Sequence, residues 1–225
     1  MDRYYCNDVP HNVPEWGEIN YQLFRKHKIP ALPLKHVIHK PFGTLLFYEY
    51  STYSYTIQYC LFDITKSFRL TIMGNHVHPN LFINLWTPID QSLNDGPIQR
   101  MQPHHYCLEN KPYYKWEAYL KKGRQYSFMY IFFPPDKMAQ LSGGASSLSH
   151  FSKCLPKKEP AKCPQEFIWC TPTMIQETYK MLHTPYPDPT KELYLENVVT
   201  SAILDGMANV ERGGPKRRGL VEILG

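Results

Sequence analysis

One segment of this 225-residue sequence constrains the fold more than any other: residues 126–133, which read YSFMYIFF. Side chains of a strand point alternately to opposite faces, and here both faces are apolar. Such a strand must be covered on both sides. In an all-β domain, that requires a barrel interior on one side and packed elements on the other. The segment therefore predicts a strand enclosed within a layered β domain.

Several shorter strand patterns precede that segment. Residues 53–62 alternate clearly, with Tyr55, Ile57 and Tyr59 on one face and Thr56 on the other. Proline accounts for 20 of the 225 residues, which suits many short strands and turns and argues against a mostly helical chain. We count seven or eight strand patterns before Pro134. Their spacing predicts a mainly β sandwich or small barrel over 42–135.

The clearest hairpin pattern joins residues 114–120 to residues 125–133. The loop between them contains Gly123, which can adopt a positive φ. We therefore expect these two strands to pair with each other.

Three flanking regions lack a clear period. Residues 1–41 are interrupted by prolines and predict an N-terminal arm, either extended or with a few edge strands. Residues 136–168 contain SGGASS and further prolines, which predicts a loop-rich bridge. Residues 211–225 have the composition of a linker toward another domain.

Helical periods appear over 169–210. Thr171 is a candidate N-cap followed by a proline, and Pro185 stops this first helix. The apolar face of the second helix consists of Leu195, Val198, Val199, Ala202 and Ile203. Two helices joined by a short Pro-rich loop form an αα-hairpin. This hairpin could pack on the β domain, on a second chain, or on both.

Charge and cysteine content exclude several classes of protein. The net charge of +5 is a mild excess, and the basic residues are scattered, so the charge implies no nucleic-acid partner. No apolar stretch reaches the roughly 18 residues that cross a membrane, and the N-terminus lacks a signal-peptide pattern. We expect a cytoplasmic protein with no membrane partner, whose six cysteines are free thiols.

His76 and His78 form the strongest metal-ligand pattern. On a strand, side chains two residues apart share a face, so both imidazoles could reach one ion. Many barrel metalloenzymes add a glutamate a few residues later, but residues 79–84 hold no carboxylate, and only His104-His105 could supply a later ligand. The competing interpretation is a turn whose histidines hydrogen-bond locally or face water. We expect no metal, and a metalloenzyme using His76 and His78 remains the alternative function.

Motifs for other chemistry are absent. The spacing of Cys154, Cys163 and Cys170 does not match a zinc site. The sequence has no nucleophile elbow, phosphate-binding loop or dinucleotide-binding fingerprint. We therefore expect no enzymatic activity and no cofactor.

The aromatic content carries the most functional information, with 17 tyrosines and 11 phenylalanines. Most of these rings belong in a core, but tyrosine and tryptophan are costly to bury unless their polar atoms are paired. A subset could line an apolar cavity for a small-molecule effector. The candidates, all on or beside expected strands, are Tyr59, Trp86, Tyr106, Trp116, Phe128 and Tyr130.

The helical region resembles a known family. Met174, Ile175, Tyr179 and Leu182 precede a Pro-Tyr turn, and residues 191–196 read KELYLE. This order resembles the two-helix region that follows the sensing barrel in AraC-type transcriptional regulators, in particular the subgroup related to siderophore-responsive regulators. The upstream loop and aromatic strand at 123–133 also look like the last hairpin of that barrel.

The resemblance implies a function. It implies a cupin-like (jelly-roll) barrel that binds a small-molecule effector, followed by helices that form a homodimer. Leu195, Val199 and Ile203 are the candidate dimer contacts. In that family a helix-turn-helix domain binds DNA, and no such pattern follows residue 208, so DNA would be bound only through a domain outside this chain. A carbohydrate- or peptide-binding module is a further alternative, which the missing signal peptide weakens.

Overall fold

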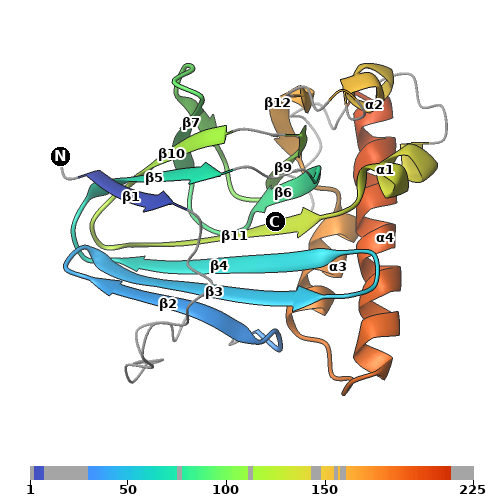
Figure 1. Cartoon of the computed structure of the whole chain (residues 1–225), viewed down its shortest axis with the longest axis horizontal. Helices are drawn as coiled ribbons and strands as arrows, with labels where there is room; N and C mark the ends of the chain where they lie inside the picture. Colours follow the sequence, from blue (N-terminus) through green and yellow to red (C-terminus); the bar gives the residue numbers. More distant parts are fainter. Residues whose placement is uncertain are drawn as a thin grey trace, which may run out of the picture.

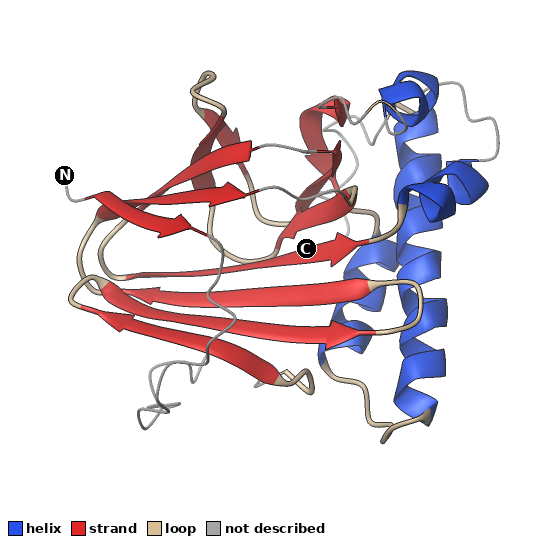
Figure 2. Cartoon of the chain, viewed as in Figure 1, coloured by secondary structure: helices blue, strands red, loops and turns tan. Residues whose placement is uncertain are grey.

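The computed structural model describes residues 3–7, 30–74, 78–110, 114–142, 148–154, 157 and 161–213. This part of the chain has three layers (Figure 1). A five-stranded first sheet faces a seven-stranded second sheet across one apolar core. Helices cover the other face of the second sheet and form a further core with it (Figure 2). The mainly β class is therefore confirmed.

The strand order shows how the layers are assembled. The first sheet runs β1 (Arg3–Asn7), β5 (Phe68–Gly74), β10 (Tyr114–Leu120), β7 (Ile89–Leu93), β8 (Gln99–Met101). The second runs β12 (Ala161–Trp169), β9 (His105–Asn110), β6 (Asn80–Asn84), β11 (Arg124–Phe132), β4 (Thr56–Ile64), β3 (Gly43–Ser51), β2 (Leu34–Lys40). The described pairs are antiparallel except β1 with β5. Both strands that fall within residues 1–41, β1 and β2, lie at sheet edges.

Strand β11 lies inside the second sheet, between β4 and β6. Phe128 points into the core between the sheets, whereas Met129 and Ile131 point into the core shared with the helices. The expectation from its doubly apolar sequence is confirmed. On β4, Ile57, Tyr59 and Leu61 likewise face the helices, as the alternation predicts.

The expected hairpin between β10 and β11 is wrong. Gly123 does adopt a positive φ of 71°, but β10 pairs with β5 and β7, and β11 pairs with β4 and β6. The two strands lie in different sheets, and Trp116 and Phe128 meet across the core between them with ring centroids 5.9 Å apart. A tight glycine loop between apolar strands can thus turn a corner between sheets as well as within one.

Residues 136–168 hold more structure than a loop-rich bridge. They contain most of helix α1 (Pro135–Ser142), helix α2 (Ser149–Cys154) and nearly all of β12. Strand β12 pairs with β9, and its register shifts between Cys163 and Ile168, a stretch that includes Pro164. Proline lacks the N–H that a regular ladder needs and is tolerated at such an irregularity, which is why the pattern hides this strand.

Helices α3 (Pro172–Leu182) and α4 (Thr190–Glu211) pack against each other. The Thr171 side chain caps α3 by accepting a hydrogen bond from the Met174 amide, as predicted. Leu195, Val199 and Ile203, the expected dimer contacts, are each 0% exposed within a single chain. They pack in the core against the second sheet and are not available to a second copy. None of the helices in the described residues is long and apolar enough to span a membrane.

Candidate functional site

The six aromatic residues proposed to line a cavity do not converge on one place. Tyr59 and Tyr106 lie in the core between the second sheet and the helices. Trp116 and Phe128 lie in the core between the sheets, with Tyr130 packed beside it. Trp86 is 46% exposed. All six rings are therefore core or surface residues, and of the six only Trp116 borders the cavity described next.

A cavity of about 140 Å³ opens between the two sheets, at the end where β7 and β8 approach β9 and β12. Its described lining includes Gln91, Gln99, Glu109, Trp116, Lys162 and Phe167. The cavity brings Gln91 and Lys162, which are 71 positions apart in the chain, into one site, because β12 returns to pair with β9. A recess bounded by aromatic walls and a few polar groups has the general character of a small-molecule site.

The floor of the cavity is buried and its rim is exposed. Glu109 and Trp116 are each 3% exposed and Gln91 is 5% exposed. Gln99 and Pro97, on the other side, are exposed, and Lys162 is half-buried. A ligand would therefore enter past the β7–β8 connection and reach the Trp116 ring and the Glu109 carboxylate.

Hydrogen bonds fix the polar side chains of the cavity. The Trp116 indole N–H donates to Gln91 Oε1, and Gln91 Nε2 donates to the Met101 sulfur at 3.7 Å. Lys162 Nζ donates to Gln99 Oε1 at 2.9 Å and lies 3.5 Å from the centroid of the Phe167 ring. Glu109 and Lys162 are directly opposite in the β9–β12 register. Among the described lining residues, the site thus combines one carboxylate, one ammonium and two aromatic walls.

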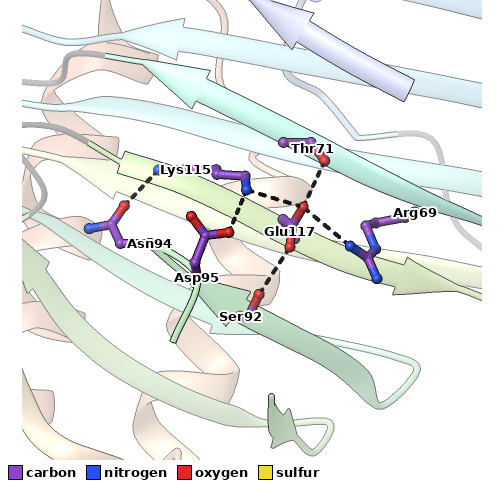
Figure 3. A network of polar contacts seen from close by, with 7 residues as sticks. All are labelled: Arg69, Thr71, Ser92, Asn94, Asp95, Lys115 and Glu117. Carbon is purple, nitrogen blue, oxygen red and sulfur yellow. Dashed lines mark hydrogen bonds and ion pairs between the residues drawn. The ribbon is translucent and has the colours of Figure 1, made fainter. Parts of the chain in front are cut away.

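A polar network on the outer face of the first sheet supports this wall of the cavity (Figure 3). The Glu117 carboxylate accepts hydrogen bonds from Thr71 Oγ1 at 3.3 Å and Ser92 Oγ at 3.5 Å. Arg69 and Lys115 place cationic nitrogens 3.7 and 3.8 Å from it. These contacts join β5, β10 and β7 next to Trp116, and Ser92 also borders the cavity. With donors on several sides, this buried carboxylate has the surroundings of a structural group.

The cavity strand leads directly into the helix pair. Strand β12, which carries Lys162 and Phe167, ends at Trp169, two residues before the N-cap of α3. Asn209 of α4 donates to the Trp169 carbonyl oxygen at 3.0 Å. The Cys170 amide donates to the His104 carbonyl oxygen at 2.7 Å. A displacement of β12 at the cavity would therefore act on both helices.

The proposed metal ligands gain no support from the described residues. His76 lies outside them, and His78 is exposed. Within the described ranges, no three histidine, cysteine or acidic side chains gather as a metal site would require. Burial raises the pKa of the Cys60 and Cys170 thiols, so neither favours the thiolate that binds metals. The Cys163 side chain and residues 214–225 of the linker expected over 211–225 also lie outside the described residues, and Glu211 belongs to α4.

Comparisons with known proteins leave the family open. No family model matches the chain, and no curated protein matches it. Among solved structures, the cupin domain of Schizosaccharomyces pombe Cnp3 is similar at 12% identity, over 52% of this chain and 74% of that one, with a TM-score of 0.35. An RmlC-like cupin from Shewanella frigidimarina is similar at 10% identity, over 46% and 85%, with a TM-score of 0.34. The Clostridium difficile EutQ protein follows at 11% identity, over 42% and 71%, with a TM-score of 0.32. At TM-scores below 0.5, these similarities do not establish a shared fold.

Sequence reasoning missed most of the polar residues of the cavity. Lys162 and Phe167 lie in the Pro-rich segment whose sequence predicts a bridge and no strand. Glu109 is the lone carboxylate of β9 and follows the apolar run Tyr106, Cys107 and Leu108. The place of Glu109 in the strand is the sequence feature that could have indicated the cavity. A charged residue on the inner face of a strand needs either a partner or a function.

Proposed function

We propose that this chain is the ligand-sensing and dimerisation part of a cytoplasmic transcription regulator of the AraC type. Its β body is a cupin-like effector domain, and the small-molecule effector binds in the cavity beside Trp116. The chain carries no catalytic activity and no cofactor. DNA is contacted through a helix-turn-helix domain outside these residues.

The observation that carries the proposal is the continuity between cavity and helices. Lys162 and Phe167 line the cavity, and the same strand ends at Trp169, whose carbonyl oxygen accepts a hydrogen bond from Asn209 of α4. A sensing domain must convert binding into a shift of another element, which requires differential contacts in the two states. A bound ligand that moves β12 would change how α3 and α4 sit on the second sheet.

The residues that carry the family resemblance hold α4 onto the β body. Lys191 donates to the Ala31 carbonyl oxygen at 2.7 Å. Glu196 accepts hydrogen bonds from Thr52 Oγ1 at 2.5 Å and from the Ser54 amide at 2.7 Å. Both contacts reach segments next to β2, β3 and β4, so the motif over 191–196 is a docking motif in this chain. This role supports the proposal because it couples the helix pair to the domain that would sense the ligand.

The outward face of α4 is the surface that suits a homodimer. Leu193 is 68% exposed and Leu204 is 43% exposed. They lie 11 residues apart, which is three helical turns, and Asn197 and Ala208 extend the same face with uncharged side chains. Isologous dimers commonly use one self-complementary patch of this kind. The dimerisation proposal therefore moves from the buried face of α4 to its exposed face.

A binding screen coupled to a dimerisation assay tests the proposal. The purified chain is screened against a library of small metabolites by thermal shift, with the Trp116→Phe variant as the matched test of the cavity. The chain is also fused to a monomeric DNA-binding domain that represses a reporter only as a dimer. We expect a ligand that stabilises the wild type by several degrees but stabilises Trp116→Phe less, and we expect repression by the fusion that changes when this ligand is added.

Two results would contradict the proposal. One is a fusion that never represses while the chain sediments as a monomer at high concentration. The other is the release of a product from a screened compound in a manner that depends on Trp116 or Glu109, which would make the chain an enzyme. A variant at an exposed site, Tyr53→Phe, serves as the control for both assays because Tyr53 is 93% exposed.

A further inference from the structure

We propose that the cavity beside Trp116 binds a neutral aromatic ring that carries a hydroxyl group, of which phenol is the simplest example. This inference rests on the proposed sensing function, because it names the chemical class of the effector. It follows from three features of the cavity, which are its balanced charge, its aromatic walls and the hydrogen-bonding capacity of the Gln91 amide.

The charge of the described lining is balanced by contacts within the chain. Lys162 Nζ donates to Gln99 Oε1 at 2.9 Å and lies 3.5 Å from the Phe167 ring centroid. Glu109 is 3% exposed and directly opposite Lys162 in the β9–β12 register, and both side chains have further interactions within the chain. A charged ligand would have to compete with these contacts and would lose its own hydration. The cavity therefore favours a neutral ligand.

The walls of the cavity favour a ring. Trp116 lines it from the first sheet and Phe167 lines it from the second. Aromatic side chains attract other rings in stacked or edge-on arrangements by more than the buried area alone predicts. The volume of about 140 Å³ is close to the engineered cavity of about 150 Å³ that holds benzene. One six-membered ring therefore fits the space between the sheets, and two fused rings exceed it.

The Gln91 amide is the polar group that selects a substituent on this ring. Gln91 is 5% exposed and makes two side-chain hydrogen bonds with the described residues. Its Oε1 accepts from the Trp116 indole, and its Nε2 donates to the Met101 sulfur at 3.7 Å. A primary amide has two N–H donors and two acceptor positions, and a thioether sulfur is a weak acceptor. One donor and one acceptor position of a buried amide thus remain for a ligand.

A hydroxyl group matches this amide in either direction. It can donate to Gln91 Oε1 or accept from Gln91 Nε2, and it carries no charge at neutral pH when it is attached to a simple aromatic ring. A methyl group in the same place would leave the amide without the added bond, and a carboxylate would bring a charge. The three features together define a small phenol.

Calorimetry with four matched ligands tests the inference on the purified chain. The ligands are phenol, toluene without the hydroxyl, cyclohexanol without the aromatic ring, and benzoate with a charge. We expect phenol to bind, cyclohexanol to bind at least about threefold more weakly, and benzoate at least about tenfold more weakly. In Gln91→Met, the affinity of phenol relative to toluene should fall by about threefold to tenfold, the value of one hydrogen bond.

Gln99→Met is the matched control, because it makes the same substitution at the exposed rim of the cavity. It should leave the affinity of phenol relative to toluene unchanged. An unchanged ratio in folded Gln91→Met, or equal changes in both variants, overturns the hydroxyl contact. If Gln91→Met does not fold, as judged by circular dichroism, the wild type decides alone, and phenol that binds no more tightly than toluene, cyclohexanol or benzoate overturns the proposal.

Failure of the ligand class is distinguishable from failure of the sensing function. If phenol does not bind but another metabolite does, and its binding weakens in Trp116→Phe, the phenol class is wrong and sensing through the cavity stands. If no compound binds in a manner that depends on Trp116, both proposals fail. Phenol binding that leaves repression by the DNA-binding fusion unchanged supports the site and contradicts its coupling to the helices.

Discussion

The Tyr106 hydroxyl of β9 donates a hydrogen bond to the Gly206 carbonyl oxygen of α4, with the two oxygens 2.7 Å apart. Tyr106 is 0% exposed, and Asn209 Nδ2 lies 3.2 Å from the same hydroxyl. A Cβ at position 206 would lie 3.3 Å from the Tyr106 ring and 3.2 Å from Met174 Cε, so a larger residue there would require these side chains to shift by a few tenths of an ångström. The pair is a buried polar contact that joins β9 to the long helix.

Removing the Tyr106 hydroxyl should loosen this contact. In Tyr106→Phe, the Gly206 carbonyl loses a buried donor and Asn209 loses an acceptor, so we expect unfolding to become easier by about 1–3 kcal/mol. Urea denaturation followed by fluorescence measures the change. Tyr53→Phe, at a residue 93% exposed, is the control and should stay within about 0.5 kcal/mol of wild type. Equal stability of the two variants would show that the contact contributes nothing.

The Glu196 side chain should matter for a different reason, since it holds the turn between β3 and β4. Its Oε1 accepts hydrogen bonds from Thr52 Oγ1 and from the Ser54 amide. Each hydrogen bond to a charged acceptor contributes about 1.5–3 kcal/mol, and relaxation of the turn and solvation by water reduce the total loss when both are removed. We expect Glu196→Ala to destabilise the chain by about 1–2 kcal/mol, because the site is half-buried and water can replace the carboxylate. Glu192→Ala, one turn earlier, is the control for helix charge. Hydrogen exchange at Ser54 should accelerate in Glu196→Ala only, and an unchanged rate would contradict this docking role.

The layers of the fold could be predicted from the sequence because they depend on alternation. The doubly apolar β11 and the alternating β4 place their side chains in the two cores as the patterns predict. The N-cap at Thr171 was also readable, because capping depends on adjacent residues. These features are local, and local chemistry suffices to determine them.

The partners of the elements could not be predicted, because pairing depends on residues distant in the chain. The loop at Gly123 looks the same whether its strands pair or separate into two sheets. Strand β12 was hidden by Pro164, and its pairing with β9 brings Lys162 opposite Glu109. The cavity, which depends on that pairing, was therefore beyond the sequence patterns. The buried face of α4 was identified correctly as apolar, but its partner is the sheet of the same chain.

Acid should weaken the fold through His105. Its ring lies edge-on to Trp169 with centroids 4.4 Å apart, and both ring nitrogens are buried without a hydrogen-bond partner among the described residues. Burial, and then the neighbouring His104, lower the pKa of His105. The unfolded chain, with a histidine pKa of about 6.5, therefore takes up a proton before the folded chain does. Stability that is fully present above about pH 6.5 is lost as the pH falls through the lower folded pKa.

Urea denaturation at a series of pH values checks this expectation. For each histidine that titrates only when unfolded, the free energy of unfolding falls by up to about 1.4 kcal/mol per pH unit. His105→Phe should make the pH dependence shallower below about pH 6.5. His78→Gln, at an exposed position, should keep the wild-type slope. His104 also has a lowered pKa from burial, so part of the slope should remain in His105→Phe. Parallel curves for wild type and His105→Phe would contradict the assignment.

The two faces of α4 should respond in opposite ways to substitution. Leu195 is 0% exposed in the core, so Leu195→Ala should cost about 2–5 kcal/mol of stability in any state of assembly. Leu193 and Leu204 are 68% and 43% exposed, so Leu193→Glu combined with Leu204→Glu should leave the monomer folded. If the exposed face forms the proposed homodimer, two buried carboxylates per copy would separate it.

Sedimentation equilibrium of three proteins distinguishes these roles. We expect the wild type to sediment as a dimer, the double glutamate variant to sediment as a folded monomer, and Leu195→Ala to lose stability while the folded fraction still dimerises. Asn197→Ala lies between the two leucines and should change association little, because a small uncharged side chain remains in its place. A wild type that is monomeric at all concentrations, or a double variant that remains dimeric, would remove α4 from the interface and require the dimer contacts to lie elsewhere on the chain.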